Sequence, residues 1–176
     1  LLFIDNLEGS LHYHLPAVMR LKGKLNKEAL TFAIQEIVNR HEILRTVYYE
    51  IEGNSFQKVN EKNKWKLSVS DGAIYKNDET GLKKYIQQLI NKPFDLSNDH
   101  MVRADLIKIS NEENILVITL HHIASDGWSL SVLVEEFLEL YGSYSENRNS
   151  YLSDLSVQYA DFAMWQRENI KDENLS

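Results

Sequence analysis

The feature that most constrains the fold is a short apolar run at residues 115–120, with the sequence ILVITL. Only Thr119 interrupts it, and its β-branched residues favour an extended strand over a helix. A strand that lacks alternating polar residues has other parts of the protein packed on both of its faces. The run therefore predicts a strand that is buried on both sides.

Strands and amphipathic helices are interspersed along the rest of the chain. We expect further strands at 15–22, 45–51, 55–60, 65–69 and 101–109, with the apolar strand spanning 114–121. Apolar residues at helical spacing predict helices at 27–40, 78–92, 128–141 and 156–168. Short polar turns within 45–60 and within 101–121 indicate hairpins. The expected fold class is therefore α/β, a two-layer sandwich with a mixed, largely antiparallel sheet.

The composition of the chain excludes several classes of function. Its 19 basic and 26 acidic residues give a net charge of −7, which argues against a nucleic-acid partner and against an anionic membrane surface. The chain has no cysteine, so disulfides, thiolate zinc sites and a cysteine nucleophile are excluded. No apolar run approaches the roughly 20 residues of a membrane span. We expect a cytoplasmic protein.

The length of 176 residues suits one domain, and the ends of the chain favour a fragment of a longer protein. The first residue is Leu1, inside an apolar stretch, and the last residues form a charged tail. The opening residues have no basic segment, so they do not resemble a signal peptide.

Residues suited to chemistry follow the apolar strand directly, in the stretch HHIASDGWS at 121–129. An imidazole is a good general base near neutral pH because its ordinary pKa is about 6.5. Successive strand residues point to opposite faces, so one of His121 and His122 faces a cleft while the other packs inward. Gly127 permits a tight turn that lets Asp126 face inward as well.

Other interpretations of this stretch must be weighed against an acid–base role. Two histidines and a carboxylate resemble the facial triad of non-haem iron, but adjacent strand residues do not easily bind one ion, so we expect no metal. A hydrolase would need a nucleophile, and there is no Gly-x-Ser-x-Gly elbow and no evident serine beside the histidines. A base without an enzyme nucleophile suits acyl transfer to an amine or alcohol. The plainest alternative is a structural histidine beside a turn and a helix cap.

Four stretches, in the expected order, resemble the condensation domains of nonribosomal peptide synthetases. The central one is HHIASDGWS, which matches the family's HHxxxDG signature. RHEILRTVY at 40–48 resembles RHExLRTxF, and YADFAMWQRE at 159–168 resembles YxDYAxWQ. KPFDLSNDHMVRADL at 92–106 resembles a conserved PFDL run, although Asp99 and His100 replace the commoner small residue and proline. The resemblance spans nearly the whole chain.

This resemblance implies the fold of chloramphenicol acetyltransferase and a peptide-bond-forming acyltransferase. Residues 1–176 would be the N-terminal subdomain of a condensation domain, and the C-terminal subdomain would be absent from this chain. The family's active site lies in a tunnel at the junction of the two subdomains. The implied partners are donor and acceptor peptidyl carrier protein domains, the missing subdomain, and an adenylation domain in the parent protein. No cofactor would bind directly, because the substrates arrive on phosphopantetheine arms.

The resemblance also implies roles for the two histidines and the glycine. His122 would be the catalytic histidine, which deprotonates the amine, positions it, or stabilises the tetrahedral intermediate. His121 would be structural. The backbone of Gly127 would approach the reacting thioester, and the helix that follows would turn its positive end toward the same region.

Two arginines in the RHEILRT stretch are candidates for bracing the catalytic loop. The resemblance implies that Asp126 forms an ion pair with one of them. We favour Arg45 because it begins a predicted strand, with Arg40 second. The alternative for both arginines is plain surface pairing with the nearby carboxylates Glu36, Glu42 or Glu50, which stabilises little.

Two further hypotheses compete with catalysis of condensation. The first is a non-catalytic folding or carrier-docking fragment, because one face of the sheet would lose its partner subdomain. The exposed apolar area could then drive self-association. The second is a free-standing acyltransferase that uses coenzyme A, because such enzymes share the HxxxDG pattern.

Overall fold

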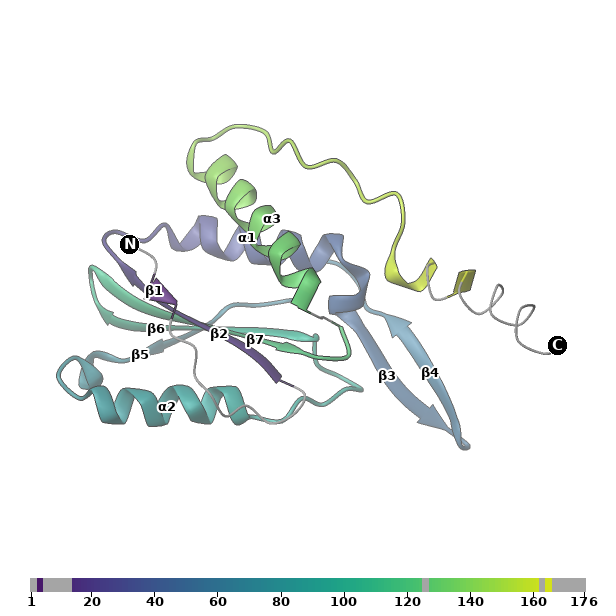
Figure 1. Cartoon of the computed structure of the whole chain (residues 1–176), viewed down its shortest axis with the longest axis horizontal. Helices are drawn as coiled ribbons and strands as arrows, with labels where there is room; N and C mark the ends of the chain where they lie inside the picture. Colours follow the sequence, from purple (N-terminus) through teal and green to yellow (C-terminus); the bar gives the residue numbers. More distant parts are fainter. Residues whose placement is uncertain (1–2, 5–13, 125–126, 162–163, 166–176) are drawn as a thin grey trace.

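The structure is a computed structural model that describes residues 3–4, 14–124, 127–161 and 164–165 (Figure 1). Within these residues the chain forms a main sheet of five strands and a separate two-stranded hairpin. None of the helices among the described residues is both long enough and apolar enough to cross a membrane.

The main sheet is mixed and largely antiparallel, as the sequence predicts. Neighbouring strands pair antiparallel throughout, except that β5 runs parallel to β6. Across the sheet the strands follow the order β1 (Phe3–Ile4), β2 (His14–Lys22), β7 (Glu113–His121), β6 (Val102–Ser110) and β5 (Ser68–Asp71). The apolar run at 115–120 therefore lies in the central strand β7, between β2 and β6.

Helices cover both faces of this sheet. Helices α1 (Lys27–Arg40) and α3 (Gly127–Ser145) lie on one face, and α2 (Glu79–Asn91) lies on the other (Figure 1). Alternate β7 residues serve the two cores, since Leu116 packs with the α1 side and Val117 with the α2 side. The predicted α/β class is confirmed. The sheet carries one more helical layer than the two-layer sandwich we expected, because both of its faces are apolar.

Local signals in the sequence explain where the first two helices begin. The side chain of Asn26 accepts a hydrogen bond from the backbone N–H of Ala29 at 3.0 Å, and Asp78 accepts one from Gly81 at 2.8 Å. These contacts satisfy amide groups that a helix start would otherwise leave without partners. Helix α1 has the predicted bounds, and α2 is one residue shorter at each end than predicted.

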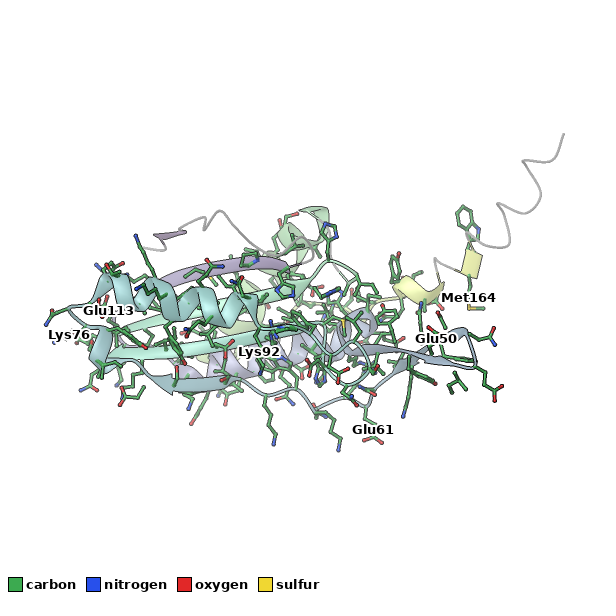
Figure 2. All side chains as sticks on the ribbon, turned by 90° about the horizontal axis from the view of Figure 1, so that it is seen from below. Glu50, Glu61, Lys76, Lys92, Glu113 and Met164 are labelled. Carbon is green, nitrogen blue, oxygen red and sulfur yellow. The ribbon has the colours of Figure 1, made fainter. Side chains whose placement is uncertain are left out.

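The hairpin of β3 (Thr46–Ile51) and β4 (Asn54–Val59) extends away from the main sheet, where Glu50 marks it in Figure 2. Glu52 and Gly53 form its turn with positive φ angles of 52° and 77°. The short 3-10 helix η1 (Glu42–Arg45) precedes it, so the strand begins one residue later than predicted.

Several segments differ from the expected elements, and helix α3 extends four residues beyond its expected end at 141. The weak strand lies at Ser68–Asp71 because Trp65 is held in the core instead, where its Nε1–H donates to the carbonyl of Val102 at 3.1 Å. Strand β1 was not predicted. Of the expected helix at 156–168, the described part is helical at 159–161 and 164–165.

Candidate active site

The histidine pair lies where the central strand ends. His121 is the last residue of β7, and His122 and Ile123 form the turn that follows it. The backbone N–H of His121 donates to the carbonyl of Met101 at 2.9 Å, and the N–H of Ala124 donates to the carbonyl of His121 at 3.0 Å. The side chain of His122 is exposed, whereas His121 is half-buried. The two imidazoles thus have different environments, because His121 ends the strand and His122 lies in the turn beyond it.

The ring of His121 braces the turn that carries His122. Its Nδ1 accepts a hydrogen bond from the backbone N–H of Ile123 at 3.2 Å, so this nitrogen carries no proton. Burial lowers the pKa of His121, and the nearby His14, His122 and Arg103 act in the same direction. His121 is therefore a neutral imidazole at neutral pH, with an acceptor nitrogen turned toward the chain that it supports.

A group of aromatic rings packs behind this turn. The rings of His14, Phe94 and His121 meet edge to face, and we call these three residues the ring cluster. The guanidinium of Arg103 lies 3.8 Å from the centre of the Phe94 ring, a cation–π contact. Arg103 also donates to the carbonyls of Lys92 and Pro93, at 2.6 and 3.0 Å.

Sequence reasoning gave no role to Phe94 or Arg103, and for His14 it favoured a structural role, with a place near the tunnel mouth as the alternative. Phe94 and Arg103 belong to the stretch at 92–106 that resembles the PFDL run, so a signal was present there. The contact of His14 with His121 could not be predicted, because it depends on strand register: the two residues pair across β2 and β7.

Arg40 connects the first helix to the helix that follows the histidine turn. Its Nη2 donates to Glu136 of α3 at 3.2 Å, and His41 donates from Nε2 to the other oxygen of that carboxylate at 2.6 Å. We call Arg40, His41 and Glu136 the Glu136 clamp. The side chain of Glu136 is 8% exposed, so the clamp is largely shielded from solvent. Sequence reasoning missed Glu136 and proposed other carboxylates for Arg40.

Arg45 is buried and has polar partners of its own. Its Nη2 donates to Glu42 at 3.1 Å, which is one of the pairings weighed as a plain alternative, and its Nη1 donates to the carbonyl of Asn60. Asp126 lies outside the described residues, so its ion pair with Arg45 or Arg40 stays a prediction. Gly127 is the first residue of α3.

Metal binding was the other interpretation of the histidine pair. Within the ranges that the structure describes, no group of three or more histidine and carboxylate side chains is placed to hold a metal ion. The observed geometry is that of a neutral, braced histidine beside an exposed one.

Comparisons with known proteins agree on one family. A family model described as "Condensation domain" matches residues 1–176. Malpinin synthetase from Mortierella alpina is 35% identical over 174 residues, which cover 98% of this chain and 2% of that protein. The chain therefore spans a small part of the curated relative that it matches.

Solved structures share the fold over most of this chain. The X-domain from teicoplanin biosynthesis is similar with a TM-score of 0.82 at 27% identity, over 96% of this chain and 37% of that one. The complex of the X-domain and OxyB, also from teicoplanin biosynthesis, matches with a TM-score of 0.80 at 28% identity, over 95% of this chain and 35% of that one.

The lowered pKa of His121 predicts a loss of stability in acid. Below the ordinary histidine value of 6.5, the unfolded chain binds a proton that the folded chain does not, so the free energy of unfolding falls as the pH drops through that value. His121→Asn keeps an acceptor for the Ile123 N–H but does not titrate. We expect the melting temperature to drop less between pH 7.5 and 5.5 in this variant than in the wild type. An equal drop in both proteins would contradict the neutral His121.

The Glu136 clamp predicts that replacing the carboxylate of Glu136 by an amide destabilises the protein. Glu136→Gln removes the charge that pairs with Arg40 and His41, and leaves a largely buried guanidinium without its counter-ion. We expect a loss of about 3 kcal/mol in urea unfolding. Glu135→Gln on the neighbouring exposed position of α3 is the matched control and should cost less than about 0.5 kcal/mol. Equal urea concentrations at the midpoint of unfolding for the two variants would show that the clamp adds no stability.

Proposed function

This chain belongs to the condensation-domain family, and from that membership we propose that it is the histidine-bearing half of an acyltransferase that forms amide bonds. The observation that carries the proposal is the exposed His122 on a turn braced by the neutral ring of His121. An exposed imidazole on a fixed turn can reach a substrate, while its neighbour holds the backbone beneath it.

The proposed reaction joins two thioesters held on carrier proteins. The amine of the acceptor attacks the carbonyl carbon of the donor thioester, the carbon–sulfur bond breaks, and the amine proton ends on the departing thiol. His122 serves this step by taking the amine proton, by positioning the amine, or by stabilising the tetrahedral intermediate. The amide groups at the start of α3, from Gly127 onward, have no partners within the helix and suit a developing negative charge.

The remaining parts of the site would come from other proteins and domains. Residues 1–176 would act as the N-terminal subdomain, and a C-terminal subdomain would supply the second wall of the tunnel. Matches that cover 37% and 35% of solved chains support a larger domain of this kind. Donor and acceptor carrier domains would deliver substrates on phosphopantetheine arms, with no directly bound cofactor, beside an adenylation domain. A cytoplasmic location belongs to the same proposal.

A second candidate is a binding module that performs no chemistry. One solved relative is a complex of the X-domain and OxyB, so a protein of similar fold is known in a protein complex. Two neighbouring apolar residues of α3, Val134 and Leu138, are 54% and 60% exposed and offer a surface for such contacts. Self-association through this face belongs to the same alternative.

Substitution of His122 tests the proposed chemistry. In the full-length protein supplied with two loaded carrier proteins, we expect His122→Ala to lower the rate of amide formation by at least about a hundredfold, the usual contribution of an acid–base group. The product is measured by mass spectrometry in single turnovers.

The neighbouring residue in the same turn provides the matched control. Ile123 is exposed and its backbone N–H is unaffected by shortening its side chain, so Ile123→Ala should leave the rate near that of the wild type. Unaltered rates in His122→Ala would remove His122 from the chemistry. Amide formation from acyl-coenzyme A without any carrier would favour the free-standing acyltransferase, and carrier binding without product would favour the binding module.

A further inference from the structure

His14 lies directly opposite His121 in the sheet. It opens β2, and its register partner in β7 is His121, so the two side chains occupy facing positions on adjacent strands. Their ring centres are 6.1 Å apart, at an interplanar angle of 63°. His14 is 6% exposed and is therefore more deeply buried than His121. The buried imidazole of His14 thus packs against His121, the residue from which the turn with His122 begins.

A hydrogen bond fixes the His14 ring to the end of α2. Its Nδ1 lies 2.7 Å from the carbonyl oxygen of Ile90, and because a carbonyl only accepts, Nδ1 carries the proton and donates it. The last carbonyls of a helix lack partners within the helix, so this bond satisfies one of them. The ring of Phe94 packs edge-on against His14 at 5.1 Å and against His121 at 5.4 Å. The ring cluster thus joins α2, the loop after it, and β7.

The orientation of the His121 ring decides whether its Nδ1 can accept the hydrogen bond from the backbone N–H of Ile123. Its Nδ1 accepts from the N–H of Ile123, and His122 lies between these two residues. A rotation of the His121 ring would release that N–H and let the backbone of His122 move. We propose that His14 is a positioning residue for His122: its ring, held by Ile90, keeps His121 oriented so that the turn stays closed. This role rests on the proposed function of His122.

The charges around the ring cluster make the arrangement sensitive to acid. The groups that lower the pKa of His121, besides its burial, are His14 from β2, His122 from the turn and Arg103 from β6. A proton on Nδ1 of His121 would remove the acceptor for the Ile123 N–H. Replacing His14 by an uncharged residue removes one of the influences that keep His121 neutral. The rate should then fall at a higher pH than in the wild type.

Two substitutions separate the hydrogen bond from the ring. His14→Asn keeps an N–H donor for Ile90 but loses the ring contact with His121. For it we expect faster hydrogen exchange at residues 121–124, about a tenfold lower kcat with little change in KM, and an acid limb of the pH–rate profile at higher pH. His14→Phe keeps a ring against His121 but loses the N–H donor to Ile90 and the influence of His14 on the pKa of His121. Because Ile90 no longer holds this ring, exchange at 121–124 should be faster than in the wild type but slower than in His14→Asn, and the acid limb should still move.

Val18→Ala provides the control for a general loosening of this strand. Val18 lies on the same face of β2 and belongs to the apolar cluster that includes Ile86 and Ile90, but its side chain is not part of the ring cluster. This variant should lose stability but keep the wild-type exchange at 121–124 and the wild-type acid limb. All variants are compared in the full-length protein.

Several outcomes would overturn the positioning role. One is a His14→Asn variant whose hydrogen exchange and pH–rate profile match those of the wild type. Another is a Val18→Ala variant that shows all the changes expected for His14→Asn. If the wild type showed no amide formation that depends on His122, the proposed function would fail. The exchange of residues 121–124 would still decide the contact between His14 and the turn, so the two failures are distinguishable.

Discussion

The burial of β7 on both faces is the constraint from which the rest of the structure follows. Its alternating residues serve two separate cores, Leu116 toward α1 and α3, and Val117 toward α2. A strand held in this way has little freedom to shift its register, because a slip by one residue would exchange the two sets of side chains. Its last residue, His121, is therefore delivered to a fixed position, and the turn beyond it starts from a rigid base.

Three contacts then hold what surrounds the turn. The ring cluster supports His121 from β2 and from the end of α2. Arg103 fixes the loop after α2 by its bonds to two carbonyls and its contact with Phe94. The Glu136 clamp ties α3 to the C-terminal end of α1, and the two helices lie on the same face of the sheet in Figure 1. The position of the exposed His122 thus depends on groups from several elements of the chain. A catalytic side chain usually needs such support to keep its orientation.

Patterns within single elements could be read from the sequence, but contacts between distant elements could not. Helix α1 was predicted to its last residue because Asn26 caps it and its apolar residues recur at helical spacing. The histidine pair was found because it follows an apolar strand directly. The contact between His14 and His121 was missed because only the register of β2 against β7 brings together two residues so far apart along the chain. Glu136 was missed because helical periodicity does not show which carboxylate meets Arg40 across two packed helices.

The central claim is that the exposed His122 performs or positions the chemistry while His121 stays behind it as a neutral brace. Chemical modification of the full-length protein by diethyl pyrocarbonate, followed residue by residue with mass spectrometry, tests this claim most directly. We expect His122 to react before His121 and His14, and amide formation to be lost at the rate at which His122 is modified. Loss of activity that tracks another histidine, with His122 still unmodified, would contradict the account.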